Sequence, residues 1–321
     1  MKIVDLPDHD KAKFDEIAAI HGTVFNTTGW ASIFGDKIRF YGIYTDNDRL
    51  IGGFILYKER KYGFSVYRNP LFTPAIGPFL KIDAQNPTTI MDTWKEALSL
   101  LADFIDKIPY SVVSSSLNLN IIDVQPFIWK KFKVIPGYTY LIDLKQPLDE
   151  LWQNISKVRK NELKKAAKDS LVVQQTDDYI CIKNLVLKTF SRQDKDVNEY
   201  YLSKILFEFA NKNNSYAFIA YKGDLPIAGT FCVYSNGTAY ALVGGYDHEQ
   251  KHRGAGPSVD WECIKYAHKL GLICFDFEGS MNPRIEKYFR GFGGQLTPYY
   301  QINKAKLPLE ILLKLYRRDL F

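Results

Sequence analysis

The stretch YAFIAYKGDLPIAGTFCVYSNGTAYALVGGY, residues 216–246, decides the fold of this chain. It consists of apolar runs rich in aromatic and β-branched residues, which favour β-strands. The runs are broken at Gly223-Asp224 and at Asn236-Gly237, and such residue pairs form the tight turns between antiparallel neighbours. We therefore expect an antiparallel β-meander here.

A helix and a strand are expected after the meander. The loop DHEQKHRGAG, 247–256, leads into residues 257–270, where apolar residues recur at helical spacing. Gly271 can end this helix because glycine accepts a positive φ. The segment ICFDFEGS, 273–280, is typical of a short apolar strand. The N-terminus of the helix would offer free backbone N–H groups and a positive dipole end, which together suit a phosphate.

The loop before this helix holds the candidates for binding a phosphate-bearing donor. They are Lys251, Arg253, Gly254 and Gly256, within the pattern Lys-x-x-Gly-x-Gly. Glycines allow a ligand to approach the backbone closely, and the cations complement its charge. A tight loop that only starts a helix is the alternative interpretation.

The loop resembles the pyrophosphate loop of the GNAT acyltransferase superfamily, Arg/Gln-x-x-Gly-x-Gly/Ala, with Lys251 in the first position. Residues 275–300, FDFEGSMNPRIEKYFRGFGGQLTPYY, are similar to the C-terminal signature of the FemAB-like branch. That signature is an Asp-Phe-x-Gly-Ser turn, a Phe-Lys/Arg-x-Phe-Gly-Gly segment and a Tyr-bearing strand. The branch includes the peptidoglycan-bridge aminoacyltransferases. The resemblance covers most of residues 139–303 and, more loosely, the N-terminal half, and it implies tandem GNAT-like domains.

The first half of the chain repeats the order of elements in the second. A meander-like segment over residues 38–70 is followed by a helix pattern and by the apolar strand YSVVSSS, 110–116. We therefore expect an α/β fold of the α+β type with mixed sheets, built as two GNAT-like domains, 1–140 and 141–321, around a shared central cleft. The first copy has a single glycine in TPAIGPFL, 73–80, and is expected to have a degenerate donor site and to form the acceptor side.

The composition is that of a globular protein, with 321 residues of which 46% are hydrophobic. A net charge of +6 allows a phosphate-bearing partner but is far from a DNA-binding footprint, so no DNA is expected. The four cysteines lack CxxC spacing and the histidines form no ligand pattern, which favours a reducing compartment and no metal site. No signal peptide or membrane-spanning segment is found, so the expected location is the cytoplasm.

A single helix is expected over residues 149–170. Arg159 lies inside its apolar stripe, four residues from both Ile155 and Leu163. A buried arginine needs an anion, from the protein or from a ligand. The segment 159–166 is similar to a FemAB-like pattern whose arginine approaches the phosphates of a sugar-nucleotide acceptor. Arg159 is therefore a candidate for substrate binding, with a structural salt bridge as the alternative.

The candidate catalytic residues follow this helix in sequence. Acyl transfer to an amine requires stabilisation of an oxyanion and removal of a proton. Asp276 and Glu278 alternate with phenylalanines, so both carboxylates are expected on one face of a strand near its C-terminal end. Two close, partly buried carboxylates raise the pKa of at least one, which suits a general base. Arg290 stands where FemAB-like proteins often have Lys, and this cation can face the oxyanion or a donor phosphate. The alternative is that Asp276 only forms an ion pair with Arg284 or Arg290.

Two aromatic residues are further candidates for substrate binding. Trp30 lies near the place where a Trp helps to line the acceptor pocket of Fem enzymes, with a place in the core as the alternative, and Tyr246 ends the meander. The expected function is transfer of an acyl or aminoacyl group to an amine of a sugar or of a cell-wall or polysaccharide precursor. The donor would be acyl-CoA or aminoacyl-tRNA, as a co-substrate and not a tightly bound cofactor. The other hypothesis is a catalytically inactive GNAT-like module that recognises a phosphorylated sugar or a protein partner.

The remaining sequence features concern partners. A basic row beside Arg159 keeps tRNA as an option, with a solvated helix face as the alternative; its members are Lys157, Lys160, Lys164 and Lys168. The C-terminal segment LPLEILLKLYRRDLF, 307–321, predicts a short amphipathic helix. Such a helix can dock on the body of the protein, on a partner or on a membrane surface. The sequence leaves these three open, as it does the oligomeric state.

Overall fold

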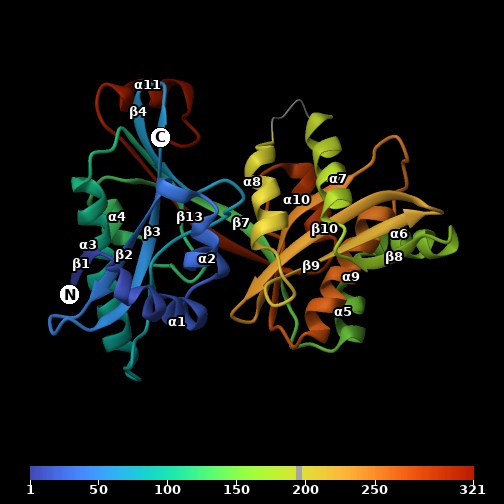
Figure 1. The fold of residues 1–321 in the computed structure, drawn as a ribbon, viewed down its shortest axis with the longest axis horizontal. Helices are drawn as coiled ribbons and strands as arrows, with labels where there is room; N and C mark the ends of the chain where they lie inside the picture. Colours follow the sequence, from blue (N-terminus) through green and yellow to red (C-terminus); the bar gives the residue numbers. More distant parts are fainter. Residues whose placement is uncertain (193–196) are drawn as a thin grey trace. The chain divides into compact units, whose positions relative to one another are not determined.

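The computed structural model describes residues 1–192 and 197–321, which form two compact units (Figure 1). Unit 1 comprises residues 1–137 and 298–321, and unit 2 comprises residues 138–297. The division after Gly137 lies close to the expected boundary at residue 140. The expected second domain, 141–321, is corrected at its end, because residues 298–321 belong to unit 1.

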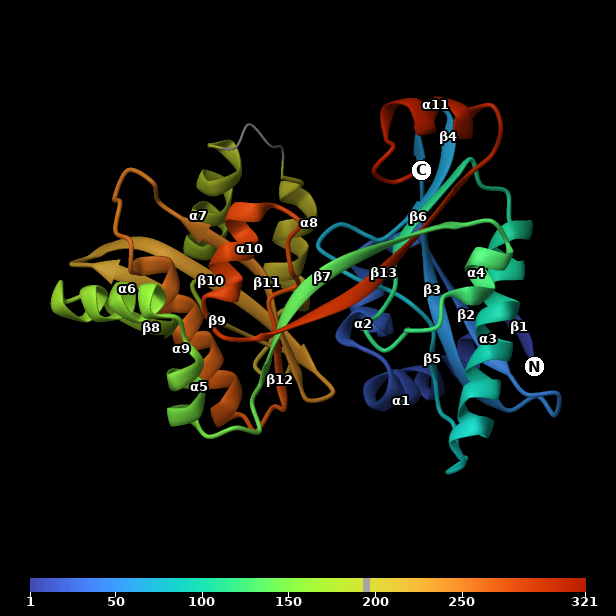
Figure 2. The same cartoon turned by 180° about the vertical axis from the view of Figure 1, so that it is seen from behind.

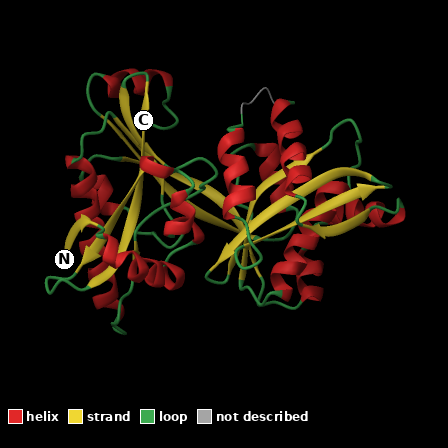
Figure 3. Ribbon diagram, in the orientation of Figure 1, coloured by secondary structure: helices red, strands yellow, loops and turns green. Residues whose placement is uncertain are grey.

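Unit 1 is built on a mixed sheet of strand order β1-β2-β3-β4-β6-β13, in which only β4 and β6 are parallel (Figure 3). Its strands are β1 (Lys2–Asp5), β2 (Ile38–Tyr44), β3 (Leu50–Lys61), β4 (Phe64–Arg68), β6 (Val112–Ser116) and β13 (Gln295–Ala305), with β5 (Phe79–Leu80) beside β3. Its helices are α1 (Lys11–His21), α2 (Thr28–Ser32), α3 (Pro87–Lys107), α4 (Gln125–Trp129) and α11 (Leu309–Tyr316).

Unit 2 has the strand order β7-β12-β11-β10-β9-β8, in which only β11 and β12 are parallel. Its strands are β7 (Lys133–Asp143), β8 (Val172–Thr176), β9 (Ser215–Lys222), β10 (Leu225–Ser235), β11 (Thr238–Tyr246) and β12 (Cys274–Asp276). Its helices are α5 (Leu148–Asn154), α6 (Lys157–Lys168), α7 (Tyr179–Ser191), α8 (Glu199–Lys204), which continues as a π-helical turn (Ile205–Phe209), α9 (Ala255–Lys269) and α10 (Pro283–Arg290).

The two sheets have the same topology. In each, four antiparallel strands are followed by one parallel strand and then by one antiparallel strand at the end. The last strand of unit 1 is β13 and that of unit 2 is β7, and each of these strands contributes residues to both units. The predicted duplication and the mixed α/β fold class are therefore confirmed.

The meander that decides the fold forms as predicted. β9 and β10 are joined by a two-residue turn at Gly223-Asp224, and β10 and β11 by another at Asn236-Gly237. Asn236 and Gly237 have φ values of 45° and 73°, as a hairpin turn of this length requires. The helix after the loop, α9, is followed by Gly271 at a φ of 72°.

Helices cover both faces of the unit 2 sheet (Figure 2). The stripe Val259, Cys263, Ile264 and Ala267 of α9 is buried in the core against the strands. α7 packs on the other face, where the Cβ that a side chain at Gly245 would add lies 2.3 Å from the Leu185 backbone. All four cysteines are free. Among the described residues, no helix has the length and apolarity needed to cross a bilayer.

The helix expected over residues 149–170 is two helices. α5 ends at Asn154, Ile155 is extended, and α6 starts after Ser156, whose side chain accepts a hydrogen bond from the Arg159 backbone N–H. Serine is a preferred N-cap because its hydroxyl satisfies a backbone donor that the first turn leaves unpaired. The apolar stripe alone did not reveal this break.

Candidate functional site

The two parallel strands of unit 2 separate at their C-terminal ends. β11 pairs with β12 only through Thr238–Cys274, Ala239–Phe275 and Tyr240–Asp276. β11 nevertheless continues to Tyr246, held on its other edge by β10. Beyond Tyr240, the edge of β11 that faces β12 has no strand partner within the described part of the chain. Its backbone groups can therefore hydrogen-bond to a ligand.

A cavity of about 620 Å³ lies at this opening. Its walls come from the divergent end of β11, the residue after β12, the first turns of α9, and from α6 and α10. The wall includes Arg159, Glu162, Thr230, Gly244, Tyr246, Arg253, Gly256, Asp260, Phe277, Arg284 and Tyr288. The volume is in the range of small-molecule sites.

Two adjacent glycines give β11 its shape at the cavity. Gly244 is exposed, and an added Cβ would meet only Thr230 Oγ1 at 3.6 Å and the Gly229 carbonyl oxygen at 3.8 Å. Gly245 faces the opposite side, against the backbone of Leu185. Gly245 therefore permits helix packing, whereas Gly244 leaves room in the cavity.

The predicted donor loop reaches the cavity with only some of its residues. Arg253 and Gly256 belong to the wall, whereas Lys251 is exposed and does not. Gly254 is buried against α6, because an added Cβ would lie 2.3 Å from the Glu162 carbonyl oxygen. The expectation that Gly254 approaches a ligand is thus corrected: this glycine allows two helices to come close.

His252 holds the loop in place. Its buried ring accepts a hydrogen bond at Nδ1 from the Gly254 backbone N–H (3.1 Å), and Nε2 lies 3.0 Å from Asp169 Oδ2. Because Nδ1 accepts, the proton of the neutral ring is on Nε2 and is donated to Asp169. The His252 backbone N–H also donates to the Tyr246 hydroxyl at 2.5 Å. These contacts tie the loop to α6 and to β11. Tyr246 lines the cavity, and its role in substrate binding stays a prediction.

A buried carboxylate forms part of the cavity wall. Asp260 accepts hydrogen bonds from Thr230 Oγ1 (2.8 Å) and from the Tyr288 hydroxyl (2.6 Å). Burial raises the pKa of Asp260, although both hydrogen bonds and the nearby Arg159 act in the opposite direction. Burial, followed by the charge of Asp260, also raises the pKa of Tyr288. Tyr288 is therefore a protonated hydroxyl, and it lies close to Gly256 at the start of α9.

Arg159 is buried at the first turn of α6, as the sequence predicts. Its guanidinium pairs with Glu162, donates to the Tyr288 carbonyl oxygen (3.0 Å) and lies over the Tyr288 ring at 4.1 Å. Its Nε has no hydrogen-bond partner among the described residues. The anion that Arg159 needs is thus supplied by Glu162, which is the structural salt bridge left open above, and the side chain also lines the cavity.

The two candidate carboxylates lie together at the end of β12. Asp276 is buried and accepts hydrogen bonds from Thr139 Oγ1 (2.5 Å) and from the Glu278 backbone N–H (2.8 Å). The strand ends at Asp276, and Glu278 follows in a turn with a φ of 58°, a strained value for this residue type. Burial, and then the charge of Asp276, raises the pKa of Glu278, whose Oε1 is buried with no hydrogen-bond partner among the described residues. Phe277, between them, points to the cavity instead.

Asp276 makes stability depend on pH. Burial raises its pKa to about 6, against the lowering by its two hydrogen bonds. The stability contributed by the protonated carboxyl is therefore fully present below its ordinary pKa and is lost as the pH rises through about 6. We expect the free energy of unfolding of the native chain, relative to Asp276→Asn, to fall by about 3 kcal/mol across this window. Denaturant unfolding of both proteins over a pH series measures this, and a difference that stays constant with pH contradicts it.

Two other predicted site residues lie outside the cavity wall. Arg290 is 61% exposed and pairs with Glu286 one helical turn earlier, at 2.8 Å. Among the described residues it forms no ion pair with Asp276 or Glu278, and its side chain is not part of the cavity wall, so the predicted oxyanion-binding role gains no support. Trp30 is fully buried in unit 1, where its Nε1–H donates to Thr73 Oγ1 at 3.0 Å. Trp30 is thus a core residue, the alternative given above.

Several wall residues were missed in the sequence. Asp260 and Thr230 are single polar residues within an apolar helix and an apolar strand, so no pattern marks them. Tyr288 lies within the FemAB-like signature segment, but the signature does not include it as a site residue. The one available signal was the Gly244-Gly245 pair, since paired glycines in a strand mark close approach by a backbone or a ligand. No three His, Cys, Asp or Glu side chains within the described ranges are grouped to hold a metal ion.

Unit 1 closes the equivalent place between its own parallel strands. The last pair of β4 and β6 is Arg68–Ser114. Beyond it, Asn69 Oδ1 accepts a hydrogen bond from the Ser116 backbone N–H (3.0 Å), and the Ile76 backbone N–H donates to the Ser116 carbonyl oxygen (2.9 Å). The edge of β6 is therefore satisfied by the chain itself.

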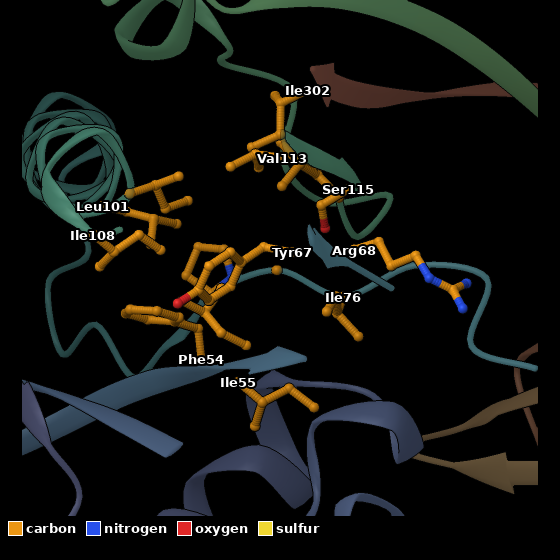
Figure 4. A pocket seen from close by; sticks show the side chains of 15 residues that line it. Phe54, Ile55, Tyr67, Arg68, Ile76, Leu101, Ile108, Val113, Ser115 and Ile302 are labelled. Atoms are coloured by element: carbon orange, nitrogen blue, oxygen red, sulfur yellow. The ribbon is translucent and has the colours of Figure 1, made fainter. Parts of the chain in front are cut away.

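Apolar side chains fill the space beside this closed edge. Figure 4 shows those of Phe54, Ile76, Leu101 and Val113 around what remains, a cavity of about 30 Å³. That volume is close to the share of one water molecule in the liquid. Unit 1 thus has a much smaller cavity at this place than unit 2, and the degenerate donor site in the first copy stays a prediction.

The part of the chain that forms most of the cavity is similar to a known domain. Residues 189–290 match the acetyltransferase (GNAT) domain, and this range contains the divergent strands, the loop, α9 and α10. No curated protein sequence matches the chain.

Solved structures agree over almost the whole chain. FemX is 12% identical, with a TM-score of 0.68 over 98% of this chain and 99% of its own. The C-terminal domain of a putative lysylphosphatidylglycerol synthetase from Agrobacterium fabrum is 10% identical, with a TM-score of 0.58 over 95% of each chain. A tandem GNAT protein from the clavulanic acid pathway is 11% identical, with a TM-score of 0.55 over 94% of this chain and 96% of its own. Residues 189–290 therefore carry a match to the GNAT acetyltransferase domain, and the whole chain shares its fold with FemX and with a tandem GNAT protein.

Proposed function

We propose that this protein is an N-acyltransferase that binds an acyl-CoA in the cavity of unit 2. The observation that carries the proposal is the free edge of β11, which opens into a cavity of about 620 Å³ at the start of α9. The two amide groups in the extended arm of coenzyme A can pair with such an edge as an added strand would. No tightly bound cofactor is required.

The cavity wall suits the charge of this donor. Arg253, Arg284 and the first turn of α9 provide two cations and a helix N-terminus, which favour phosphate groups. Near Phe277 the strands converge on the last pair, Tyr240–Asp276. An extended donor with its phosphates at α9 would bring its thioester toward this point.

The chemistry at that point follows from the neighbouring groups. An attacking amine forms a bond to the thioester carbonyl carbon, the C–S bond breaks, and the amine loses one proton while the thiolate gains one. Glu278 does not line the cavity but directly follows Phe277, which does. With its raised pKa, Glu278 is the proposed base that takes the proton from an amine entering beside Phe277. The Tyr288 hydroxyl lies in the cavity wall and is the proposed donor of a proton to the thiolate.

The acceptor is the part of the proposal that rests on the family. From the resemblance of residues 275–300 to the branch that includes the peptidoglycan-bridge aminoacyltransferases, we infer an amine on a sugar or on a cell-wall or polysaccharide precursor. An aminoacyl-tRNA would be an alternative donor, and the basic row on α6 is the observation in its favour. The inactive binding module is the competing hypothesis, because the Lys251 position departs from the family loop.

Calorimetric titration of the full chain with coenzyme A tests the donor. We expect a dissociation constant between about 1 μM and 1 mM, the usual range for enzyme substrates. Binding of aminoacyl-tRNA but not of coenzyme A would replace the proposed donor. Binding of neither, together with a phosphorylated sugar found by mass spectrometry of copurified ligands, would favour the binding module.

A further inference from the structure

The C-terminal helix of unit 1 has apolar residues on two faces. Leu309 and Leu313 are half-buried, and Phe321 beyond the helix is buried. Lys133 Nζ donates to the carbonyl oxygens of Arg318 (3.1 Å) and Phe321 (2.9 Å), so the end of the chain is anchored. The opposite face of α11 and the residue before it are nevertheless apolar and exposed: Leu307, Ile311, Leu312, Leu315 and Tyr316. α11 therefore presents an apolar surface that its own packing does not use.

A hairpin end in the same unit adds exposed aromatic residues. The turn between β3 and β4 carries Tyr62, which is 90% exposed, and β4 begins with Phe64, which is 45% exposed. Isolated exposed apolar residues are common on protein surfaces. Two aromatic residues at the end of a hairpin beside an apolar helix are a different case, because neighbouring exposed apolar groups add up to a larger apolar surface.

Strand pairing brings the hairpin end and the helix to the same end of the sheet. Val112 of β6 pairs with Val66 of β4 on one side and with Ala305 of β13 on the other. One residue further out, Ser111 accepts a hydrogen bond from the Lys306 backbone N–H (3.0 Å) and donates one to the Ser65 carbonyl oxygen (2.8 Å). Figures 1 and 2 both show α11 beside the end of β4. We call this surface, comprising Tyr62, Phe64, Leu307, Ile311, Leu312, Leu315 and Tyr316, the α11 patch.

The charges around the α11 patch are mostly positive. Its two segments, 60–64 and 306–319, contain six cations: Arg60, Lys61, Lys306, Lys314, Arg317 and Arg318. They contain two carboxylates, Glu310 and Asp319, which pair with Lys314 and Arg317, respectively. Exposed apolar and aromatic side chains accompanied by Lys and Arg match the chemistry of an anionic bilayer surface.

We propose that the α11 patch docks this protein on the surface of an anionic lipid bilayer. The exposed apolar side chains would enter the boundary between headgroups and acyl chains, and the cations would contact anionic headgroups. The helix lies in the interface and does not cross it. This inference is independent of the acyltransferase proposal, since the α11 patch lies in unit 1 and shares no residue with the cavity of unit 2.

Co-sedimentation of the full chain with lipid vesicles tests the proposal. We expect binding to phosphatidylcholine vesicles that contain phosphatidylglycerol, and binding at least about tenfold weaker without phosphatidylglycerol or at high salt. The double variant Ile311→Asp/Leu315→Asp should reduce binding by about tenfold or more, because two charges replace inserted apolar groups. Both side chains are exposed, so the melting temperature should stay unchanged.

The matched control makes the same chemical change elsewhere on unit 1. Met91 and Ile122 are also exposed, and Met91→Asp/Ile122→Asp adds the same charge away from the patch, so it should retain most of the binding. Equal loss in both double variants would overturn the proposal, as would absence of binding to anionic vesicles by the native chain. Sedimentation velocity tests whether the α11 patch instead binds a second copy of this chain. A native chain that is dimeric, with a monomeric Ile311→Asp/Leu315→Asp variant, would assign the α11 patch to a dimer interface and overturn the proposal.

Discussion

Gly244→Trp is expected to weaken coenzyme A binding by at least about a hundredfold, or about 2.7 kcal/mol, while the protein stays folded. Gly244 is exposed in the cavity wall, and its added Cβ would meet no atom closer than 3.6 Å. An indole at this position would therefore fill the cavity and cover the free edge of β11 without entering the core. Calorimetric titration and thermal unfolding of the same preparations measure the two effects.

A graded series at this position sharpens the result. Gly244→Ala should bind nearly as well as the native chain, and Gly244→Val should lie between Ala and Trp, since the loss follows the volume added. Gly29→Trp is a matched control, because Gly29 is exposed in unit 1 and an added Cβ there meets no atom within 4 Å. If Gly244→Trp bound coenzyme A with the native affinity, the donor would have to bind outside this cavity.

Glu278→Gln is expected to lower turnover by about a hundredfold or more, with little change in donor affinity. Burial and the charge of Asp276 raise the pKa of Glu278, so the base form gains population as the pH rises. The rate of the native enzyme should therefore increase through this pKa, and the variant should lack that increase. Stability should not fall, because the amide avoids placing a charge on a buried oxygen that has no hydrogen-bond partner.

A nearby carboxylate serves as the control for this experiment. Glu286→Gln makes the same change on α10, where Glu286 pairs with the exposed Arg290. It should leave turnover within a few fold of the native value. Equal losses in the two variants would remove Glu278 from the mechanism. Full activity in Glu278→Gln, together with normal donor binding, would show that the amine needs no base at this position.

The binding-module hypothesis gives a different pair of results. A module without catalysis would show no turnover in any variant, yet Gly244→Trp would still abolish binding of its ligand if that ligand uses the cavity. The two experiments therefore separate where a ligand binds from whether it reacts. The bilayer experiment adds a third result, which does not depend on either.

Local features of the sequence were sufficient for the fold. The turn pairs 223–224 and 236–237, the apolar stripe of α9 and Gly271 each depend on residues a few positions apart, and each was predicted. The repeated order of elements was also visible in the sequence, because it is a property of succession along the chain. The break at Ser156 was not, since a single N-cap residue within an apolar stripe has little weight against the periodicity.

The site depended on contacts between distant residues. The sequence determined that Asp276 and Glu278 lie close together, that Arg159 is buried and that a loop precedes α9, because each follows from periodicity or adjacency. Only the tertiary structure decided that Gly254 packs on α6, that Glu162 neutralises Arg159, and that Arg290 faces solvent. It also decided that β11 continues beyond its last pair with β12, and that Asp260 accepts a hydrogen bond from Tyr288 beside the resulting cavity. The physical reason is that a cavity is the space several elements leave between them, and no single segment of the chain encodes that space.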